Sequence, residues 1–156
     1  MHPIIQQAQK AQLAAVLQLQ KECYQSEAAL YNDYSIQPLS QTIEELNHDF
    51  DNGEICLVAA IGKNIVGAVR GSAQAGTGYI GKLIVAPLFQ NQGIGKQLMA
   101  HIEKKLDAVD RFELFTGSRS LKNISLYKKL GYQAFDQKII NDALILVYLE
   151  KINKKE

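Results

Sequence analysis

One segment limits the possible folds more than any other: an apolar run passes a proline, crosses a glycine-bearing turn and becomes a helix. Residues 82–106 read KLIVAPLFQNQGIGKQLMAHIEKKL. After the turn, apolar residues recur every fourth position at Ile94, Leu98, Ile102 and Leu106, which predicts one apolar stripe on a helix. The segment therefore predicts a buried strand, a tight turn and an amphipathic helix in direct succession.

The rest of the chain predicts a mixed sheet with helices on its faces. Ahead of the glycine turn we expect a strand at 3–8, a helix over Ala11–Cys23 and a helical turn and loop at 24–39. A second helix capped by Ser40 or Thr42 follows. Three strands come next, at Ile55–Ile61, Ile65–Ala73 and Tyr79–Val85. After residues 82–106 we expect a strand at Phe112–Thr116, a helix over 120–130 ended by Gly131, and strands at Tyr132–Gln137 and Ala143–Glu150. These elements predict a single α/β (α+β) domain over residues 1–156.

Composition and charge exclude several functional classes. The formal net charge of +1 argues against a nucleic-acid partner, because nucleic-acid binders carry a basic face. The N-terminus MHPIIQQAQK lacks a signal peptide's apolar core, and no apolar run is long enough to span a bilayer, so we expect a cytoplasmic protein without a membrane partner. Cys23 and Cys56 are far apart and group with no histidine, so no metal site is expected.

The glycine turn is suited to binding a phosphate. The first turn of a helix leaves backbone N–H groups without intrahelical partners, and the helix dipole adds partial positive charge there. Gly93 and Gly95 would let this backbone approach a ligand closely, and Lys96 adds charge. An ordinary tight turn is the structural alternative, because short glycine patterns are weak signals.

Two common phosphate-binding patterns do not match. A P-loop needs a glycine where this chain has Gln90 and a serine or threonine where it has Gln97. A dinucleotide fingerprint needs a third glycine where this chain has Leu98. A protein that binds ATP or NAD remains a rival hypothesis.

A third pattern does match. Gln90-x-x-Gly93-x-Gly95 after LIVAP resembles the acetyl-CoA signature of the GCN5-related N-acetyltransferase (GNAT) superfamily, and ELFTGSRSLKNISLYKKLGYQAF at 113–135 looks like that family's fifth strand, fourth helix and sixth strand. The resemblance implies a mixed, mostly antiparallel sheet of six to seven strands flanked by about four helices. It implies an acetyl-CoA-dependent N-acetyltransferase that transfers the acetyl group directly to a primary amine. The alternative is a catalytically inactive acyl-CoA-binding sensor or interaction module.

The resemblance also implies roles for particular residues. The fourth and fifth strands would splay apart, with the main chain of Leu83, Ile84 and Val85 contacting the pantetheine arm and the Val85 N–H serving as an oxyanion donor. Asn123 would contact the cofactor, and Tyr127 would act as general acid on the leaving thiolate, although a core tyrosine is the structural alternative. The turn that would wrap the pyrophosphate consists of Gln90, Asn91, Gln92, Gly93, Ile94, Gly95 and Lys96.

The base that deprotonates the amine and the acceptor itself are less constrained. The strand YIGKLIV carries no acid, unlike the matching strand of many relatives, so the candidate bases lie elsewhere, at Glu22, Glu27, Asp33 or Tyr79. The resemblance favours Glu27, because that region borders the acceptor cleft in the family. Residues 22–51 are acidic and rich in tyrosine, which is typical of a solvated helix face or of a rim that attracts cations. Arg70 could instead bind a substrate carboxylate. We expect a small-molecule or peptide amine as partner and a possible homodimer. Neither cysteine is near the signature in sequence, which disfavours an acetyl-cysteine route.

Overall fold

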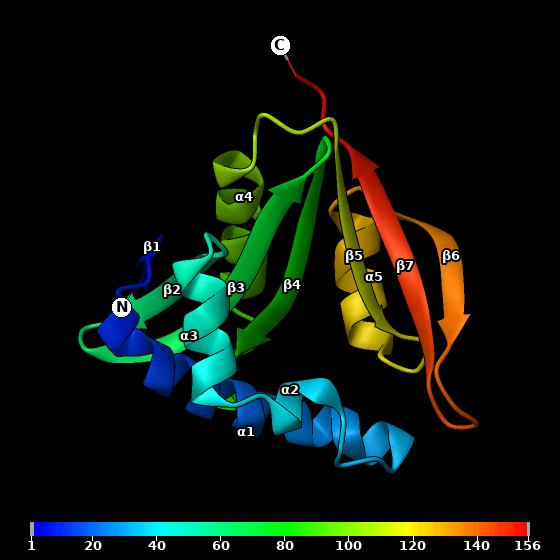
Figure 1. The fold of residues 1–156 in the computed structure, drawn as a ribbon, viewed down its shortest axis with the longest axis horizontal. Helices are drawn as coiled ribbons and strands as arrows, with labels where there is room; N and C mark the ends of the chain where they lie inside the picture. Colours follow the sequence, from blue (N-terminus) through cyan, green and yellow to red (C-terminus); the bar gives the residue numbers. More distant parts are fainter. Residues whose placement is uncertain (1, 156) are drawn as a thin grey trace.

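The computed structural model describes residues 2–155, which form one seven-stranded sheet in the order β1-β2-β3-β4-β5-β7-β6 (Figure 1). The strands are β1 (Ile4–Gln7), β2 (Ile55–Ile61), β3 (Asn64–Gln74), β4 (Thr77–Val85), β5 (Arg111–Gly117), β6 (Gln133–Ile139) and β7 (Ile145–Ile152). Only β4 and β5 pair in parallel, and the other neighbours are antiparallel. The predicted mixed, mostly antiparallel sheet is confirmed.

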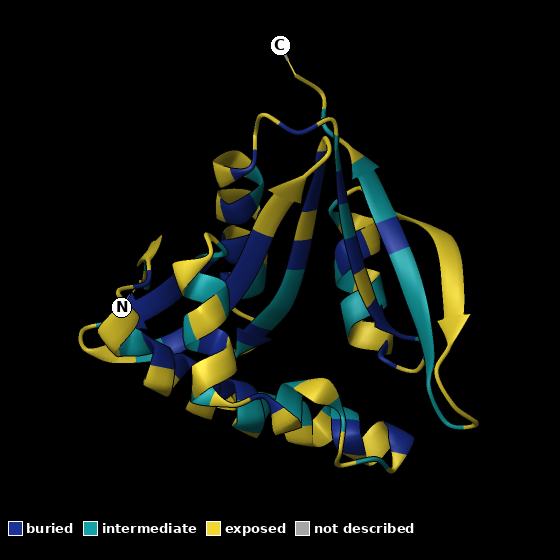
Figure 2. Cartoon of the chain, in the orientation of Figure 1, coloured by how far each residue is buried: buried dark blue, intermediate teal, exposed yellow. Residues whose placement is uncertain are grey.

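Helices cover both faces of this sheet. They are α1 (Leu13–Tyr31), α2 (Gln37–Ser40), α3 (Ile43–Asp51), α4 (Ile94–Lys105) and α5 (Leu121–Lys129). In Figure 1, α1 and α3 lie on the face of β2–β4 opposite to α4, while α5 lies behind β5 and β7. The front of β5, β7 and β6 carries no helix, and every residue of β6 is exposed (Figure 2).

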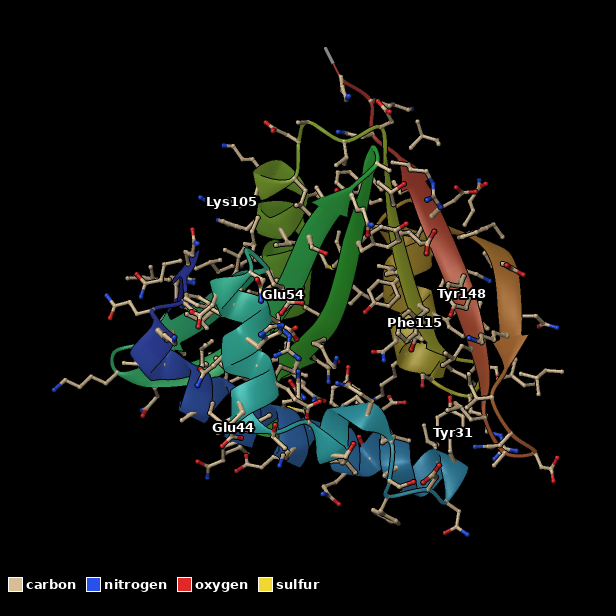
Figure 3. The ribbon with its side chains drawn as sticks, viewed as in Figure 1. Tyr31, Glu44, Glu54, Lys105, Phe115 and Tyr148 are labelled. Carbon is tan, nitrogen blue, oxygen red and sulfur yellow. The ribbon has the colours of Figure 1, made fainter. Side chains whose placement is uncertain are left out.

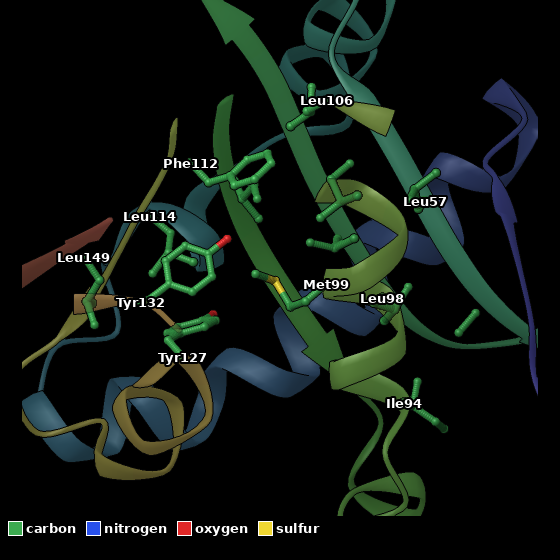
Figure 4. Close-up of a cluster of buried hydrophobic side chains, with 14 of the residues drawn as sticks. Leu57, Ile94, Leu98, Met99, Leu106, Phe112, Leu114, Tyr127, Tyr132 and Leu149 are labelled. Carbon is green, nitrogen blue, oxygen red and sulfur yellow. The ribbon is translucent and has the colours of Figure 1, made fainter. Parts of the chain in front are cut away.

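The main core lies between the sheet and the apolar stripe of α4 that the sequence periodicity predicted. Ile94, Leu98, Ile102 and Leu106 are all buried, as the four-residue repeat predicted. They pack, together with Met99, against side chains of the sheet such as Leu57, Phe112, Leu114 and Leu149 (Figure 4). A second cluster on the other face joins Leu13, Val16, Leu46 and Val58. Burying apolar area on both faces is the main force holding the layers together.

The first helix is longer than predicted. The expected end at Cys23 is wrong, because α1 continues to Tyr31 and ends at Asn32 in a left-handed conformation (φ 48°). The Tyr31 hydroxyl accepts a hydrogen bond from the Arg119 N–H (2.9 Å) and lies 3.1 Å from Ser120 Oγ. Contacts with the far half of the sheet therefore stabilise two further turns that lack strong local periodicity.

The capping prediction for the helix α3 is confirmed at Thr42. Thr42 Oγ1 accepts from the Glu45 N–H (3.2 Å), and Glu45 Oε1 accepts from the Thr42 N–H (2.9 Å), which forms a reciprocal capping box. Ser40, the other candidate cap, is the last residue of α2.

The parallel pair β4–β5 separates soon after it forms. Its ladder joins only Thr77–Tyr79 to Arg111–Glu113. Beyond it, the β3–β4 register shifts between Ala68 and Arg70, and Lys82 adopts a left-handed φ of 53°, which is the geometry of a bulge. The two strands then diverge into a V (Figure 1). This divergence positions the candidate site.

Candidate functional site

The open edge of β4 presents main-chain groups towards the gap. The Ala86 N–H donates to Val66 O (2.8 Å) on β3, so the preceding residue, Val85, directs its N–H and C=O the other way, towards β5. The carbonyl of Val85 already accepts from Gln90 Nε2 (3.0 Å) and Cys23 Sγ (3.4 Å). The side chains of Leu83 and Ile84 pack into the two cores. A ligand in the gap would therefore meet the main chain of Val85, whereas the neighbouring Ile84, which pairs with Ala68, directs its main-chain groups towards β3.

The glycine turn presents a run of unpaired backbone donors. Within residues 2–155, no N–H group of residues 91–96 has a hydrogen-bond acceptor. Asn91 (φ 63°) and Gly93 (φ 85°) are left-handed, and alternation of this kind turns successive N–H groups into an anion-binding concavity. A Cβ added at Gly93 would meet no atom within 4 Å, so the concavity is not filled by the protein. The turn has the donors and the space that a pyrophosphate needs.

The side chains of Gln90 and Ile94 in the turn contact the protein itself rather than the gap. Gln90 ties the turn to β4 through its bond to Val85 O, so its amide is engaged within the protein. Ile94 is buried in the core below α4. Only the main chain of Ile94 can contact a ligand. The side chains of Asn91, Gln92 and Lys96 are exposed.

Tyr127 combines a core ring with a free hydroxyl. Its side chain is 7% exposed, and the ring packs edge-on to Tyr132 with centroids 6.0 Å apart (Figure 4). Within the described chain its hydroxyl makes no hydrogen bond, whereas the Tyr132 hydroxyl donates to Glu103 Oε2 (2.8 Å). Burial raises the pKa of Tyr127, and nearby Tyr24 and Glu27 raise it further. The group stays protonated, which is the form that a proton donor requires.

Glu27 on α1 contacts Ser120 and Asn123, although they are distant from it in sequence. Its Oε2 accepts a short hydrogen bond from Ser120 Oγ, and its Oε1 lies 3.5 Å from Asn123 Nδ2. Asn123 also lies 3.4 Å from Thr116 Oγ1 at the end of β5. The structure thus brings Glu27, Asn123 and Tyr127 to the same end of the gap.

The other candidate bases are placed less favourably. Asp33 accepts from Ser35, Tyr79 is 41% exposed on β4, and Glu22 is exposed on α1. The acidic residues of 22–51 do not form a single rim: Glu45 caps α3, and Asp51 pairs with Lys10 at 2.8 Å. Their main roles are local.

The separation of Cys23 from the signature holds in sequence but not in space. Cys23 is far from the glycine signature in sequence, but its thiol lies 3.4 Å from Val85 O at the mouth of the gap. Burial, reinforced by Glu22, raises the pKa of Cys23 to about 11, so the thiol is neutral near pH 7 and a weak nucleophile. The sequence had no signal for this contact, because only the packing of α1 on β4 creates it.

Arg70 belongs to a buried polar cluster beside β4, which the sequence did not predict. Arg70 is buried, and its Nη2 donates to Gln20 Oε1 (2.7 Å) and Gln41 Oε1 (3.0 Å). Glu54 lies 3.6 Å from Arg70 Nε, and burial raises the pKa of this carboxyl group. Burial and Arg70 together lower the pKa of Lys82 to about 8. Arg70 and Lys82 therefore form a desolvated cationic pair next to the gap.

Aromatic side chains border the gap on its other side. Phe115 on β5 and Tyr148 on β7 lie side by side on the open face of the sheet, with ring centroids 5.4 Å apart (Figure 3). Phe115 is 56% exposed. The gap is thus lined by apolar and polar groups on opposite walls.

Residues 2–155 contain no group of three His, Cys, Asp or Glu side chains arranged to hold a metal ion. None of the helices in the same range is both long and apolar enough to cross a bilayer.

Comparisons with known proteins agree with this geometry. Residues 13–132 match the acetyltransferase (GNAT) family. An acetyltransferase of Pectobacterium atrosepticum is 35% identical over 94 residues, which cover 59% of this chain and 64% of that relative, so the match spans less than two thirds of the relative's length.

Two solved structures share the fold at low sequence identity. The PaiA N-acetyltransferase of Thermoplasma acidophilum, in complex with coenzyme A, superposes with a TM-score of 0.80 at 19% identity and covers 97% of this chain and 99% of its own. YncA, a putative acetyltransferase from Salmonella typhimurium with acetyl-CoA, gives a TM-score of 0.78 at 16% identity, with coverage of 100% and 96%.

Proposed function

The chain belongs to the acetyltransferase (GNAT) family, and from this premise we propose that it transfers the acetyl group of acetyl-CoA directly to a primary amine. The acceptor would be a small molecule or a peptide. The observation that carries the proposal is the run of unpaired N–H groups at residues 91–96, next to the point where β4 and β5 diverge. Two neighbours in fold are structures with coenzyme A or acetyl-CoA.

The residues present fit acetyl-CoA. Backbone donors at 91–96 would bind the pyrophosphate, and the outward-facing amide groups of β4 would pair with the amides of pantetheine, which buried polar groups require. The side chain of Asn123 would contact the cofactor. Acetyl-CoA supplies an activated acyl group as a thioester.

The chain's own groups would handle the protons and the charge. Glu27 would accept the proton of the acceptor ammonium, whose pKa resembles that of lysine, about 10.4. The Val85 N–H would stabilise negative charge that develops on the carbonyl oxygen. The Tyr127 hydroxyl, held protonated by burial, would donate to the departing sulfur. The neutral Cys23 thiol supports direct transfer over an acetyl-cysteine route.

A second candidate function has one observation in its favour. Position 81 on β4 is a glycine with open space above it, so no carboxylate stands on that strand. This favours a protein that binds an acyl-CoA and senses it without catalysis. The Tyr127 hydroxyl argues against this alternative, because it is protonated and makes no hydrogen bond within residues 2–155, as a proton donor to the departing sulfur requires.

Release of free CoA from acetyl-CoA, measured with a panel of amines, tests the proposal. We expect turnover with at least one amine and a large loss of turnover in Tyr127→Phe. Tight binding of CoA with no turnover for any amine would favour the sensor. Stabilisation by ATP or NAD, but not by CoA, would favour the nucleotide-binding hypothesis instead.

A further inference from the structure

The Arg70 guanidinium is buried but incompletely paired. Its side chain is 3% exposed, and Nη1 is the buried side-chain nitrogen or oxygen that has no hydrogen-bond partner within residues 2–155. Glu54 does not relieve this, because its carboxylate faces Nε at 3.6 Å, beyond hydrogen-bond distance. An unsatisfied buried donor on a charged group is costly, so a missing partner is expected here.

Lys82 is a second cation without a partner beside it. Within the described residues, its Nζ makes no hydrogen bond and no salt bridge, although the side chain is only partly exposed. Glu54 and Asp49 are the anionic groups that act on it, and they do not offset the effect of burial and of Arg70. Its left-handed backbone (φ 53°) fixes it at the bulge of β4.

Open space adjoins the two cations. Arg70 and Gly81 are partners across the β3–β4 ladder, so their side-chain positions share one face of the sheet. A Cβ at Gly81 would meet no atom within 4 Å. Gly81 precedes Val85, whose N–H is the proposed oxyanion donor, by four residues, which corresponds to about 13 Å along an extended strand.

We propose that Arg70 and Lys82 form a subsite for a carboxylate of the acceptor, so that the acceptor is an amine that also carries a carboxylate rather than a simple amine. The inference rests on the proposed function and adds the substrate class. A carboxylate near the open position at Gly81 supplies acceptors for Arg70 Nη1 and for Lys82.

Kinetic comparison of matched acceptors tests the subsite. For several amino acids, kcat/KM is measured against the corresponding amino-acid amide and the decarboxylated amine, in the wild type, Lys82→Met, Arg70→Lys and the control Lys63→Met, a change at an exposed turn lysine. We expect the wild type and the control to prefer the carboxylate by about tenfold or more, equivalent to about 1.4 kcal/mol. In Lys82→Met and Arg70→Lys the preference should approach one, with rates on the amides unchanged.

Calorimetry separates failure of the subsite from failure of the proposed function. Binding of N-acetyl amino acids and of their amides is measured on CoA-saturated protein. If no amine is acetylated, the proposed function fails, and loss of carboxylate-dependent binding in Lys82→Met would still support the subsite. Equal rates on acids and amides in the wild type would overturn the subsite. An unchanged preference for the carboxylate in Lys82→Met would also overturn the subsite. So would an equal fall of kcat/KM on all acceptors in Arg70→Lys, because a purely structural role for Arg70 predicts such an equal fall.

Discussion

Glu27 and Asn123 lie 96 positions apart in the chain, yet Oε1 of the first is 3.5 Å from Nδ2 of the second. Glu27 comes from the C-terminal part of α1, and Asn123 comes from the first turn of α5. Their contact brings α1 to the end of the gap between β4 and β5, next to Tyr127. Both residues were predicted separately, and their proximity makes a shared site testable.

Glu27→Gln should lower turnover by about 10²-fold or more, because the amide cannot accept a proton. The pH–rate profile should shift upward, since the acceptor must then lose its proton to solvent, with a pKa of about 10.4. The measurement is kcat between pH 6 and 10. Glu22→Gln, at an exposed position of the same helix, is the control and should keep the wild-type profile. An unchanged profile in Glu27→Gln would remove it as the base.

Tyr127→Phe should reduce kcat by about 10²-fold or more while leaving the free energy of unfolding within about 0.5 kcal/mol. Its hydroxyl has no hydrogen bond within residues 2–155 to lose. Tyr132→Phe is the matched control. It breaks the bond to Glu103 and should cost about 1–3 kcal/mol in urea denaturation without a comparable loss of turnover. Equal kinetic effects of the two changes would contradict a proton-donor role.

Gly93→Val should abolish stabilisation by CoA, because the branched side chain enters the open concavity of the turn. The left-handed φ of 85° also makes valine strained, so the protein should lose about 1–3 kcal/mol of stability. Gly53→Val supplies a control with the same strain, since Gly53 has φ 98° and open space at a remote turn. The readout is the rise in Tm on adding CoA, which Gly53→Val should retain. Full protection of Gly93→Val would show that the pyrophosphate site is misplaced.

Gly117→Ala should destabilise the protein by about 2–4 kcal/mol. A Cβ there would lie 1.9 Å from the Tyr31 hydroxyl, so α1 would have to move away from β5 and give up the bond to the Arg119 N–H. Gly81→Ala, where a Cβ meets no atom within 4 Å, should change stability little. Urea denaturation of both variants gives the comparison. Similar midpoints would mean that α1 is not anchored at this contact.

Lys82→Met should make the protein more stable at pH 7 by about 1–3 kcal/mol, because the folded state no longer holds a desolvated ammonium. The pKa of Lys82 falls from 10.5 to about 8 on folding, so between these pH values the unfolded chain binds more protons. The contribution of Lys82 to the unfolding free energy therefore rises with pH in this window, and the advantage of the variant should fade towards pH 10. Urea denaturation from pH 7 to 10 measures the difference. A constant difference would contradict the lowered pKa.

Local sequence was sufficient for the elements and for the glycine turn. The repeat of Ile94, Leu98, Ile102 and Leu106 predicts a one-sided helix because periodicity alone determines which face is buried. Gly93 is needed where φ is positive, so its place in the turn is also a local property. The family resemblance depends on this stretch, on residues 113–135 and on the order of the elements.

Contacts between distant segments required the tertiary structure. The sequence predicted a helix from Ala11 to Cys23, but only the anchoring of Tyr31 at Arg119 and Ser120 carries α1 to residue 31. Likewise, nothing local shows that Cys23 touches Val85 or that Arg70 is buried with an unpaired nitrogen. Periodicity and turn chemistry act over a few residues, so the sequence by itself determined the order of strands and helices and the glycine turn. Burial, pKa and hydrogen-bond pairing depend on which segments pack together, so only the folded chain decided the contact between Glu27 and Asn123, the protonation of Tyr127 and the cationic pair.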